Sequence, residues 1–184
     1  MKLIIVDLDG TLFDTKDVNY FAYKDAIVPY GYDIDYKYYC DFCNGRHYMD
    51  FLPQITTFDK DKLEKMHLAK KRAYKKYLNK AVINEGLVDI IRLLRLEYKT
   101  AVVTTASKEN CYDILKEFDL VNLFDLILTR DDISKSKPDP EGFLKAMQYF
   151  DANPTETIIF EDSDIGLEAA KRTGAFYYKT YCFN

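Results

Sequence analysis

The sequence contains few of the residues that build a disulfide framework or a zinc site. Its 184 residues include only four cysteines and two histidines. The cysteines are Cys40, Cys43, Cys111 and Cys182, and they are too few and too scattered for a disulfide-stabilised fold. Cys40 and Cys43 form a single CxxC pair, but neither histidine is spaced to complete a zinc site with them. We therefore interpret these two cysteines as reduced thiols on a helix.

Long apolar runs and an excess of basic residues are also missing. No stretch approaches the roughly 20 apolar residues of a membrane-spanning helix, and the chain enters an apolar strand directly, without a basic and then apolar leader. The net charge of −4 gives no electrostatic footprint for a nucleic-acid backbone. We therefore expect a cytoplasmic protein, a monomer or a weak homodimer, that binds neither membranes nor nucleic acid.

The first residues of the chain combine a core strand with acidic side chains. Residues 3–6 form a short, continuous apolar run rich in β-branched residues, which is typical of a strand buried on both faces of a parallel sheet. Asp7 and Asp9 follow it, and side chains two residues apart in an extended chain share a face. Both carboxylates can therefore point into one space beyond the carboxyl edge of the sheet, where open α/β sheets bind ligands.

The rest of the chain divides into a helical stretch and an alternating one. Apolar spacing predicts helices over 17–30, 35–42, 48–55 and 59–78. After residue 83, strands are predicted at 100–103, 124–128, 157–160 and near 176–178, with helices at 87–96, 110–118, 141–150 and 167–172. Alternation of this kind is typical of βαβ units. We predict an α/β fold, a doubly wound parallel sheet built from 1–15 and 83–184, interrupted by an inserted all-helical domain at 16–82.

Polar residues follow four of the predicted strands. They are Asp7 and Asp9, Thr104 and Thr105, Lys137, and Glu161 with Asp162. Each group alone has an ordinary structural explanation, such as a turn, a backbone-bonded threonine or a solvated loop. The carboxyl ends of parallel strands open on the same edge, however, so that explanation would require four coincidences.

This combination fits phosphoryl transfer through a covalent carboxylate. An aspartate is ionised at pH 7, so it can attack phosphorus without a base. A carboxylate that approaches a phosphate is repelled unless cations and donors neutralise the oxygens, which calls for Mg²⁺ and a lysine. Asp7, Glu161 and Asp162 can hold a hard cation. Lys137 can offset the negative charge of the nucleophile and of the phosphate.

The other polar residues have further tasks in this interpretation. The Thr104 hydroxyl and backbone N–H groups would hold the phosphate oxygens, and Gly10 and Thr11 complete a turn that brings N–H groups toward them. Asp9 would protonate the leaving oxygen and later deprotonate the attacking water. The expected partner is a small-molecule phosphate ester.

These segments resemble, in order, the four motifs of the haloacid dehalogenase-like hydrolases. The motifs are DLDGTLFD at 7–14, Thr104, Lys137 with Pro138, and Glu161-Asp162-Ser163 followed by Gly166 and Ala169-Ala170. The resemblance implies that Asp7 is the nucleophile and a Mg²⁺ ligand. It also implies that Asp9 is the acid/base and lends its backbone carbonyl to the metal, and that Asp162, with Glu161 beside it, is a metal ligand. Thr105 is an alternative to Thr104 at the phosphate, and Lys135 is a lesser alternative to Lys137.

The helical stretch resembles the small cap domain of phosphoglycolate phosphatases and β-phosphoglucomutases, with hinges near 15–16 and 83–85. By that resemblance the cap selects the leaving group. In the loop at 44–47 we take Arg46 as the candidate contact for a second anionic group of the substrate, with an exposed structural arginine as the alternative.

The resemblance also bears on the reaction. Family members that break carbon–halogen or carbon–phosphorus bonds usually lack an aspartate two residues after the nucleophile, so Asp9 favours hydrolysis of a phosphate ester. The alternative is a β-phosphoglucomutase-like phosphosugar mutase, whose cap pattern the residues after Gly45 do not match well. A non-catalytic phosphate-binding or Ca²⁺-binding protein is less expected, since neither acidic segment continues into a full calcium loop.

Overall fold

The computed structural model describes residues 2–180 and 183, and it divides the chain into two compact units. One unit comprises Met1–Asp14 and Val82–Asn184, and the other comprises Thr15–Ala81. The boundaries predicted from the sequence lie one residue further along the chain. Cys182 lies outside the described residues.

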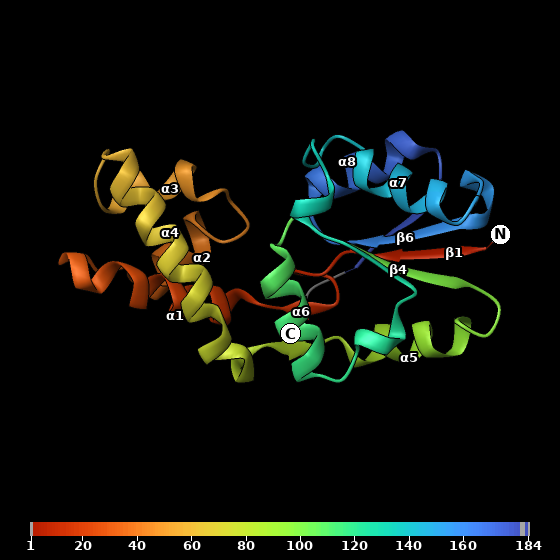
Figure 1. Cartoon of the computed structure of the whole chain (residues 1–184), viewed down its shortest axis with the longest axis horizontal. Helices are drawn as coiled ribbons and strands as arrows, with labels where there is room; N and C mark the ends of the chain where they lie inside the picture. Colours follow the sequence, from red (N-terminus) through yellow and green to blue (C-terminus); the bar gives the residue numbers. More distant parts are fainter. Residues whose placement is uncertain (1, 181–182, 184) are drawn as a thin grey trace. The chain divides into compact units, whose positions relative to one another are not determined.

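A five-stranded parallel sheet forms the centre of the first unit (Figure 1). Its strands are β1 (Leu3–Val6), β4 (Lys99–Val103), β5 (Leu126–Leu128), β6 (Thr157–Glu161) and β7 (Phe176–Lys179), in the order β5-β4-β1-β6-β7. All four residues of the central strand β1 are buried, and Ile5 pairs with Ala101 on one side and Ile159 on the other. The predicted doubly wound α/β fold is confirmed.

Helices cover both faces of this sheet (Figure 1). On one face lie α7 (Glu141–Tyr149) and α8 (Asp164–Thr173), and on the other lie α5 (Glu85–Leu94) and α6 (Lys108–Glu117). Short 3₁₀ segments occur at Val121–Leu123, Arg130–Asp132 and Pro154–Glu156. The side chains of Ser107 and Ser163 cap the N-termini of α6 and α8, a few residues after β4 and β6 end. Both helices therefore begin at the carboxyl edge of the sheet.

A two-stranded antiparallel ribbon joins the two points where the chain leaves and re-enters the first unit. It consists of β2 (Phe13–Asp14) and β3 (Val82–Ile83). Asn84 reinforces it: its backbone N–H donates to the Leu12 carbonyl at 2.9 Å and its side chain donates to the Thr11 carbonyl at 3.1 Å. The sequence did not predict this ribbon, because a strand of two residues is too short to show a periodic pattern.

The second unit contains the four predicted helices. They are α1 (Lys16–Ile27), α2 (Tyr36–Phe42), α3 (Tyr48–Ile55) and α4 (Lys60–Tyr74), with 3₁₀ segments at Val28–Tyr30 and Lys75–Lys80. Its core is rich in aromatic residues: Tyr20, Tyr23, Tyr39 and Phe51 pack with Leu63 and Met66. Asp35, His47 and Asp59 cap the starts of α2, α3 and α4.

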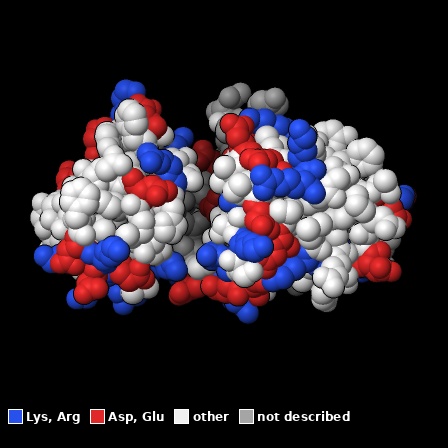
Figure 2. Space-filling model, turned by 90° about the horizontal axis from the view of Figure 1, so that it is seen from above, with Lys and Arg blue, Asp and Glu red and all other residues white. Residues whose placement is uncertain are grey.

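Surface features agree with the composition. Basic and acidic side chains are interspersed on the face shown in Figure 2. In the part of the chain that the structure describes, no helix is long and apolar enough to cross a membrane.

Replacing Ile5 with alanine tests the central position of β1. Ile5 is completely buried, so Ile5→Ala is expected to lower the free energy of unfolding by about 2–5 kcal/mol through lost burial and a residual cavity. Leu93→Ala is the matched control, because Leu93 lies on α5 with 71% of its surface exposed, and its effect is expected within about 0.5 kcal/mol. Urea unfolding of the full chain measures both, and equal effects would contradict the assigned core.

Candidate active site

A buried group of charges lies at the carboxyl edge of the sheet. Asp7 directly follows β1 and is 5% exposed. The Lys137 ammonium nitrogen lies 2.5 Å from Asp7 Oδ1 and 2.9 Å from Glu161 Oε1, and the Lys137 side chain is itself 8% exposed. The structure thus brings together three residues that are separated in the sequence by as many as 154 positions, from Asp7 to Glu161.

The Glu161 carboxylate is held by the loop that follows β6. Its Oε2 accepts the Ser163 N–H at 2.9 Å, while the Ser163 hydroxyl accepts the Gly166 N–H at 3.1 Å and so caps α8. A Cβ atom added at Gly166 would lie 1.9 Å from Glu161 Oε1. Glycine at this position therefore lets the carboxylate lie against the first turn of α8.

Asp162 is held by Thr11, which is in turn contacted by Thr180. The Thr11 hydroxyl, fully buried, donates to Asp162 Oδ1 at 2.8 Å, and the Thr180 hydroxyl donates to Thr11 at 3.3 Å. Thr180 was not among the predicted site residues, and no local pattern near the end of the chain marks it. The Thr11 side chain therefore orients Asp162, which the sequence interpretation did not foresee.

Gly10 supplies space next to Asp162. Its φ is +92°, and an added Cβ would lie 2.2 Å from Asp162 Oδ2, so both the backbone conformation and the close approach require glycine. Its N–H donates to the Phe13 carbonyl at 2.7 Å, within its own turn. The Gly10 N–H is thus used within the turn, and the expectation that backbone N–H groups of this turn face a phosphate stays a prediction.

The acidic side chains form a cluster suited to a hard cation. One oxygen each from Asp7, Glu161 and Asp162 lies within 4.8 Å of the others. With all three ionised and Lys137 protonated, three negative charges meet one positive charge, which leaves a net charge of −2. Carboxylate oxygens are the ligands that Mg²⁺ prefers, and its two positive charges equal this excess. The residues present therefore fit a divalent cation.

Burial and mutual repulsion alter the protonation of this cluster. Burial raises the pKa of the Asp7 carboxyl well above its usual range, against the opposing charge of Lys137, and the neighbouring carboxylates raise it further. Burial also raises the pKa of Asp162, against the hydrogen bond from Thr11. For Lys137 the attraction of Asp7 and Glu161 outweighs burial, so its pKa lies above the usual value. A cation bound by these oxygens would hold the carboxylates ionised.

Asp9 is half-buried in the turn after β1, where it forms an isolated bridge with Phe13. The charge of Asp9 affects a cysteine of α6. Burial, and after it the negative charges of Asp9 and Asp7, raise the pKa of the Cys111 thiol to about 12. The charges of both aspartates thus act on the same completely buried cysteine of α6.

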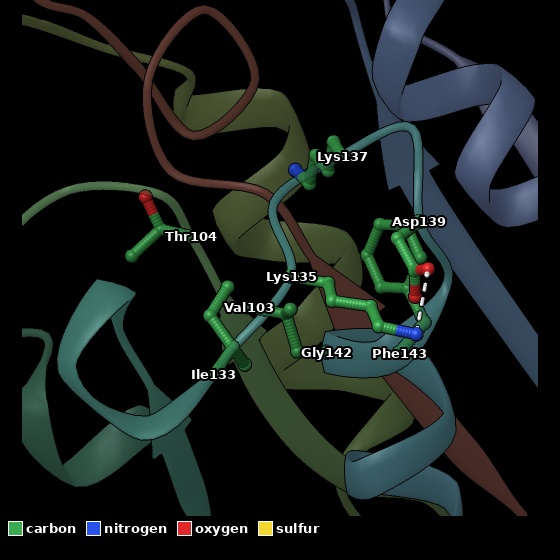
Figure 3. Close-up of a pocket in the computed structure, with 8 residues that line it drawn as sticks. All are labelled: Val103, Thr104, Ile133, Lys135, Lys137, Asp139, Gly142 and Phe143. Atoms are coloured by element: carbon green, nitrogen blue, oxygen red, sulfur yellow. Dashed lines mark ion pairs between the residues drawn. The ribbon is translucent and has the colours of Figure 1, made fainter.

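The two threonines after β4 have different environments. Thr104 is 1% exposed; its N–H donates to the Leu128 carbonyl at 3.0 Å, and its hydroxyl accepts the Ala106 N–H at 3.0 Å. Thr105 is exposed. Thr105 is thus the more exposed residue of the two, whereas Thr104 lines a pocket together with Lys137 (Figure 3).

The loop that carries Lys137 is fixed by the first turn of α7. Glu141 accepts hydrogen bonds from the Ser134 N–H at 2.9 Å, the Ser134 hydroxyl at 2.6 Å and the Lys135 N–H at 2.7 Å. The Lys135 side chain is exposed and points to Asp139, 3.8 Å away, whereas Lys137 points elsewhere (Figure 3). Lys137 is therefore the lysine brought to the acidic cluster. The sequence interpretation missed Glu141, although an acidic residue in the first turn of a helix is a recognisable signal.

Arg46 belongs to the second unit. It is exposed, and its guanidinium donates to the Phe42 carbonyl at 3.0 Å, near the end of α2. His47 begins α3 as its N-cap, and His67 stacks on Tyr48 with ring centroids 4.0 Å apart. Both histidines thus have structural contacts within this unit.

Comparisons with known proteins agree with this geometry. A sequence model of the haloacid dehalogenase-like hydrolases matches residues 4–178, a range that includes all four groups of polar residues. The phosphorylated carbohydrates phosphatase of Thermotoga maritima is 29% identical over 95% of this chain and 82% of its own length. The β-phosphoglucomutase of Bacillus subtilis is also 29% identical, over 96% of this chain and 81% of its own length.

A solved structure shows the same fold. The crystal structure of CbbY from Rhodobacter sphaeroides in complex with phosphate superposes with a TM-score of 0.81 at 23% identity, covering 98% of this chain and 87% of that one. At that identity the likeness establishes the fold alone, while the sequence model that spans nearly the whole chain establishes the family. The expected hydrolase family is confirmed, and the chain belongs to the haloacid dehalogenase-like hydrolases.

Proposed function

We propose that this protein is a Mg²⁺-dependent phosphatase that hydrolyses a small phosphorylated metabolite through an aspartyl phosphate on Asp7. The observation that carries the proposal is the buried Lys137 ammonium between Asp7 and Glu161, beside Asp162. Relatives named as phosphatases, including the Thermotoga maritima protein, support the reaction class.

In the first step a carboxylate oxygen of Asp7 attacks phosphorus, and the bond from phosphorus to the ester oxygen breaks. Asp9 donates its proton to that departing oxygen, which leaves as an alcohol. The Lys137 ammonium, fixed on Asp7 Oδ1, lowers the repulsion between the nucleophile and the negatively charged phosphate.

In the second step a water molecule attacks the phosphorus of the aspartyl phosphate. Asp9, now a carboxylate, accepts the proton of this water, and the bond between phosphorus and the Asp7 oxygen breaks. Inorganic phosphate leaves, Asp7 is again a carboxylate and Asp9 is again protonated. Every group of the enzyme thus returns to its starting state.

Asp7, Asp162 and the backbone carbonyl of Asp9 would hold the Mg²⁺, with Glu161 beside them. Both Glu161 oxygens already accept hydrogen bonds, from Lys137 and Ser163, so its main task in the proposal is to hold Lys137. When bound, Mg²⁺ supplies positive charge that stabilises the phosphate oxygens.

The second unit, Thr15–Ala81, is proposed to serve as the substrate-selecting cap. Arg46 supports this role because it is exposed and carries a guanidinium suited to an anionic group. Identity alone does not separate a phosphatase from a mutase, since the two relatives described above are equally similar to this chain. A screen of phosphorylated metabolites that includes β-glucose 1-phosphate distinguishes them: release of inorganic phosphate supports the phosphatase, and isomerisation to a 6-phosphate supports the mutase.

The central prediction concerns Asp7 and the metal. Purified protein is expected to hydrolyse an aryl phosphate with Mg²⁺ and to lose this activity with EDTA, because the excess negative charge of the site then repels the substrate. Asp7→Asn is expected to lower turnover more than about 10³-fold, since an amide is a poor nucleophile. Release of phosphate measures both effects.

Asp89→Asn is the matched control for this prediction. It makes the same isosteric change at an exposed position on α5, where Asp89 pairs with Arg92 at the surface, and turnover should not change. Wild-type turnover in Asp7→Asn would show that the nucleophile is assigned to the wrong residue.

The two threonines after β4 give a further prediction. Thr105→Val is expected to raise the KM for an aryl phosphate about tenfold, since Thr105 is exposed and its hydroxyl is the proposed contact for a phosphate oxygen. Thr104→Val is expected to lower the melting temperature with a smaller effect on KM, because its hydroxyl accepts the Ala106 N–H. Steady-state kinetics and thermal unfolding separate the two variants, and the reverse pattern would assign the phosphate to Thr104.

A further inference from the structure

The Lys137 ammonium has a further neighbour besides its two carboxylate partners. An ammonium has three N–H donors, and Asp7 Oδ1 and Glu161 Oε1 each accept one hydrogen bond from it. The side chain is 8% exposed, so little water reaches it. The Lys137 nitrogen also lies over the ring of Phe143, 5.1 Å from the ring centroid.

The position of the Phe143 ring is fixed by its packing in the core. It lies in α7, is 1% exposed, and packs with Leu3, Ile5 and Val103 in the core on that face of the sheet. The Phe143 side chain is therefore part of the hydrophobic core, and a face of its ring also meets the Lys137 ammonium. The helix is itself tied to the Lys137 loop, since Glu141 accepts hydrogen bonds from Ser134 and Lys135.

We propose that Phe143 is a positioning residue for Lys137: the ring of Phe143 holds the Lys137 ammonium against Asp7. The face of an aromatic ring attracts a cation, and this attraction increases where water is excluded. A leucine would keep an apolar side chain in the core but would leave the ammonium facing alkyl carbon. The inference rests on the proposed function, because it assigns Phe143 to the lysine that neutralises the nucleophile and the phosphate.

The contact between Phe143 and Lys137 matters during the reaction, because the charge on Asp7 changes. When Asp7 becomes an acyl phosphate, a mixed anhydride, its carboxylate loses the charge that attracts Lys137, whereas the attraction of the ring does not depend on that charge. Together with Glu161, Phe143 therefore keeps the ammonium in place through both steps. The effect of losing the ring is expected in turnover more than in the affinity for substrate.

The test compares two substitutions. Phe143→Leu removes the ring and keeps an apolar side chain, and it is expected to lower kcat about tenfold while KM changes less than about twofold. Phe143→Tyr keeps the ring and is expected to retain kcat within about twofold. Thermal unfolding of both variants shows whether each is folded at the assay temperature.

A second measurement does not depend on activity. In NMR spectra of the wild-type protein, the ε-methylene protons of Lys137, assigned with the Lys137→Arg variant, should be shifted upfield by the ring. This shift should be lost in Phe143→Leu. If Phe143→Tyr does not fold, the shift in the wild-type spectrum still tests whether the Phe143 ring lies against Lys137.

The outcomes separate the inference from the proposed function. Equal losses of kcat in folded Phe143→Leu and Phe143→Tyr, or a Lys137 resonance without a ring shift in the wild-type protein, would overturn the positioning role. A wild-type protein that hydrolyses no phosphate ester would overturn the proposed function, while the Lys137 resonance would still test the contact.

Discussion

The constraint on which this site depends is the burial of one ammonium between two carboxylates. Removing one partner from a buried ion pair costs about 3–5 kcal/mol, because the remaining charge is left without compensation. The neighbouring residues hold these charges in place: Ser163 binds Glu161, Thr11 binds Asp162, and Glu141 fixes the loop that carries Lys137. The polar contacts at this edge of the sheet thus form one connected arrangement.

Strand register explains why the carboxylates meet. Val6 pairs with Phe160 across β1 and β6, so the next residues, Asp7 and Glu161, are neighbours at the ends of these strands. Adjacent strands lie about 4.8 Å apart, a spacing that brings two carboxylates close enough to share one cation. The Asp7 N–H donates to the Phe160 carbonyl at 3.0 Å and extends the pairing by one residue. A slip of one residue would turn one carboxylate to the other face.

The sequence predicted the parts of this arrangement that depend on local pattern. Buried apolar strands predicted the sheet, and the polar residues after them pointed to one edge, which is where Asp7, Lys137 and Glu161 meet. Contacts between distant side chains could not be predicted. Thr180 meets Thr11 across 169 positions. Phe143 is close to Lys137 in the sequence, but their contact depends on the path of the loop that precedes α7, which no periodic pattern describes. The choice between Thr104 and Thr105 depended on where β4 ends, which periodicity does not resolve to one residue.

Charge also links the binding of metal and substrate in the proposed reaction. A site with a net charge of −2 repels a phosphate dianion, and a divalent cation cancels that excess. The helices α6 and α8 begin at this edge, so their N-termini direct partial positive charge toward it, but each provides only about half an elementary charge. These dipoles and Lys137 together do not balance both the carboxylates and the phosphate. In the proposed reaction phosphate binding would therefore depend on the cation, and by linkage a bound phosphate would in turn strengthen the binding of the cation.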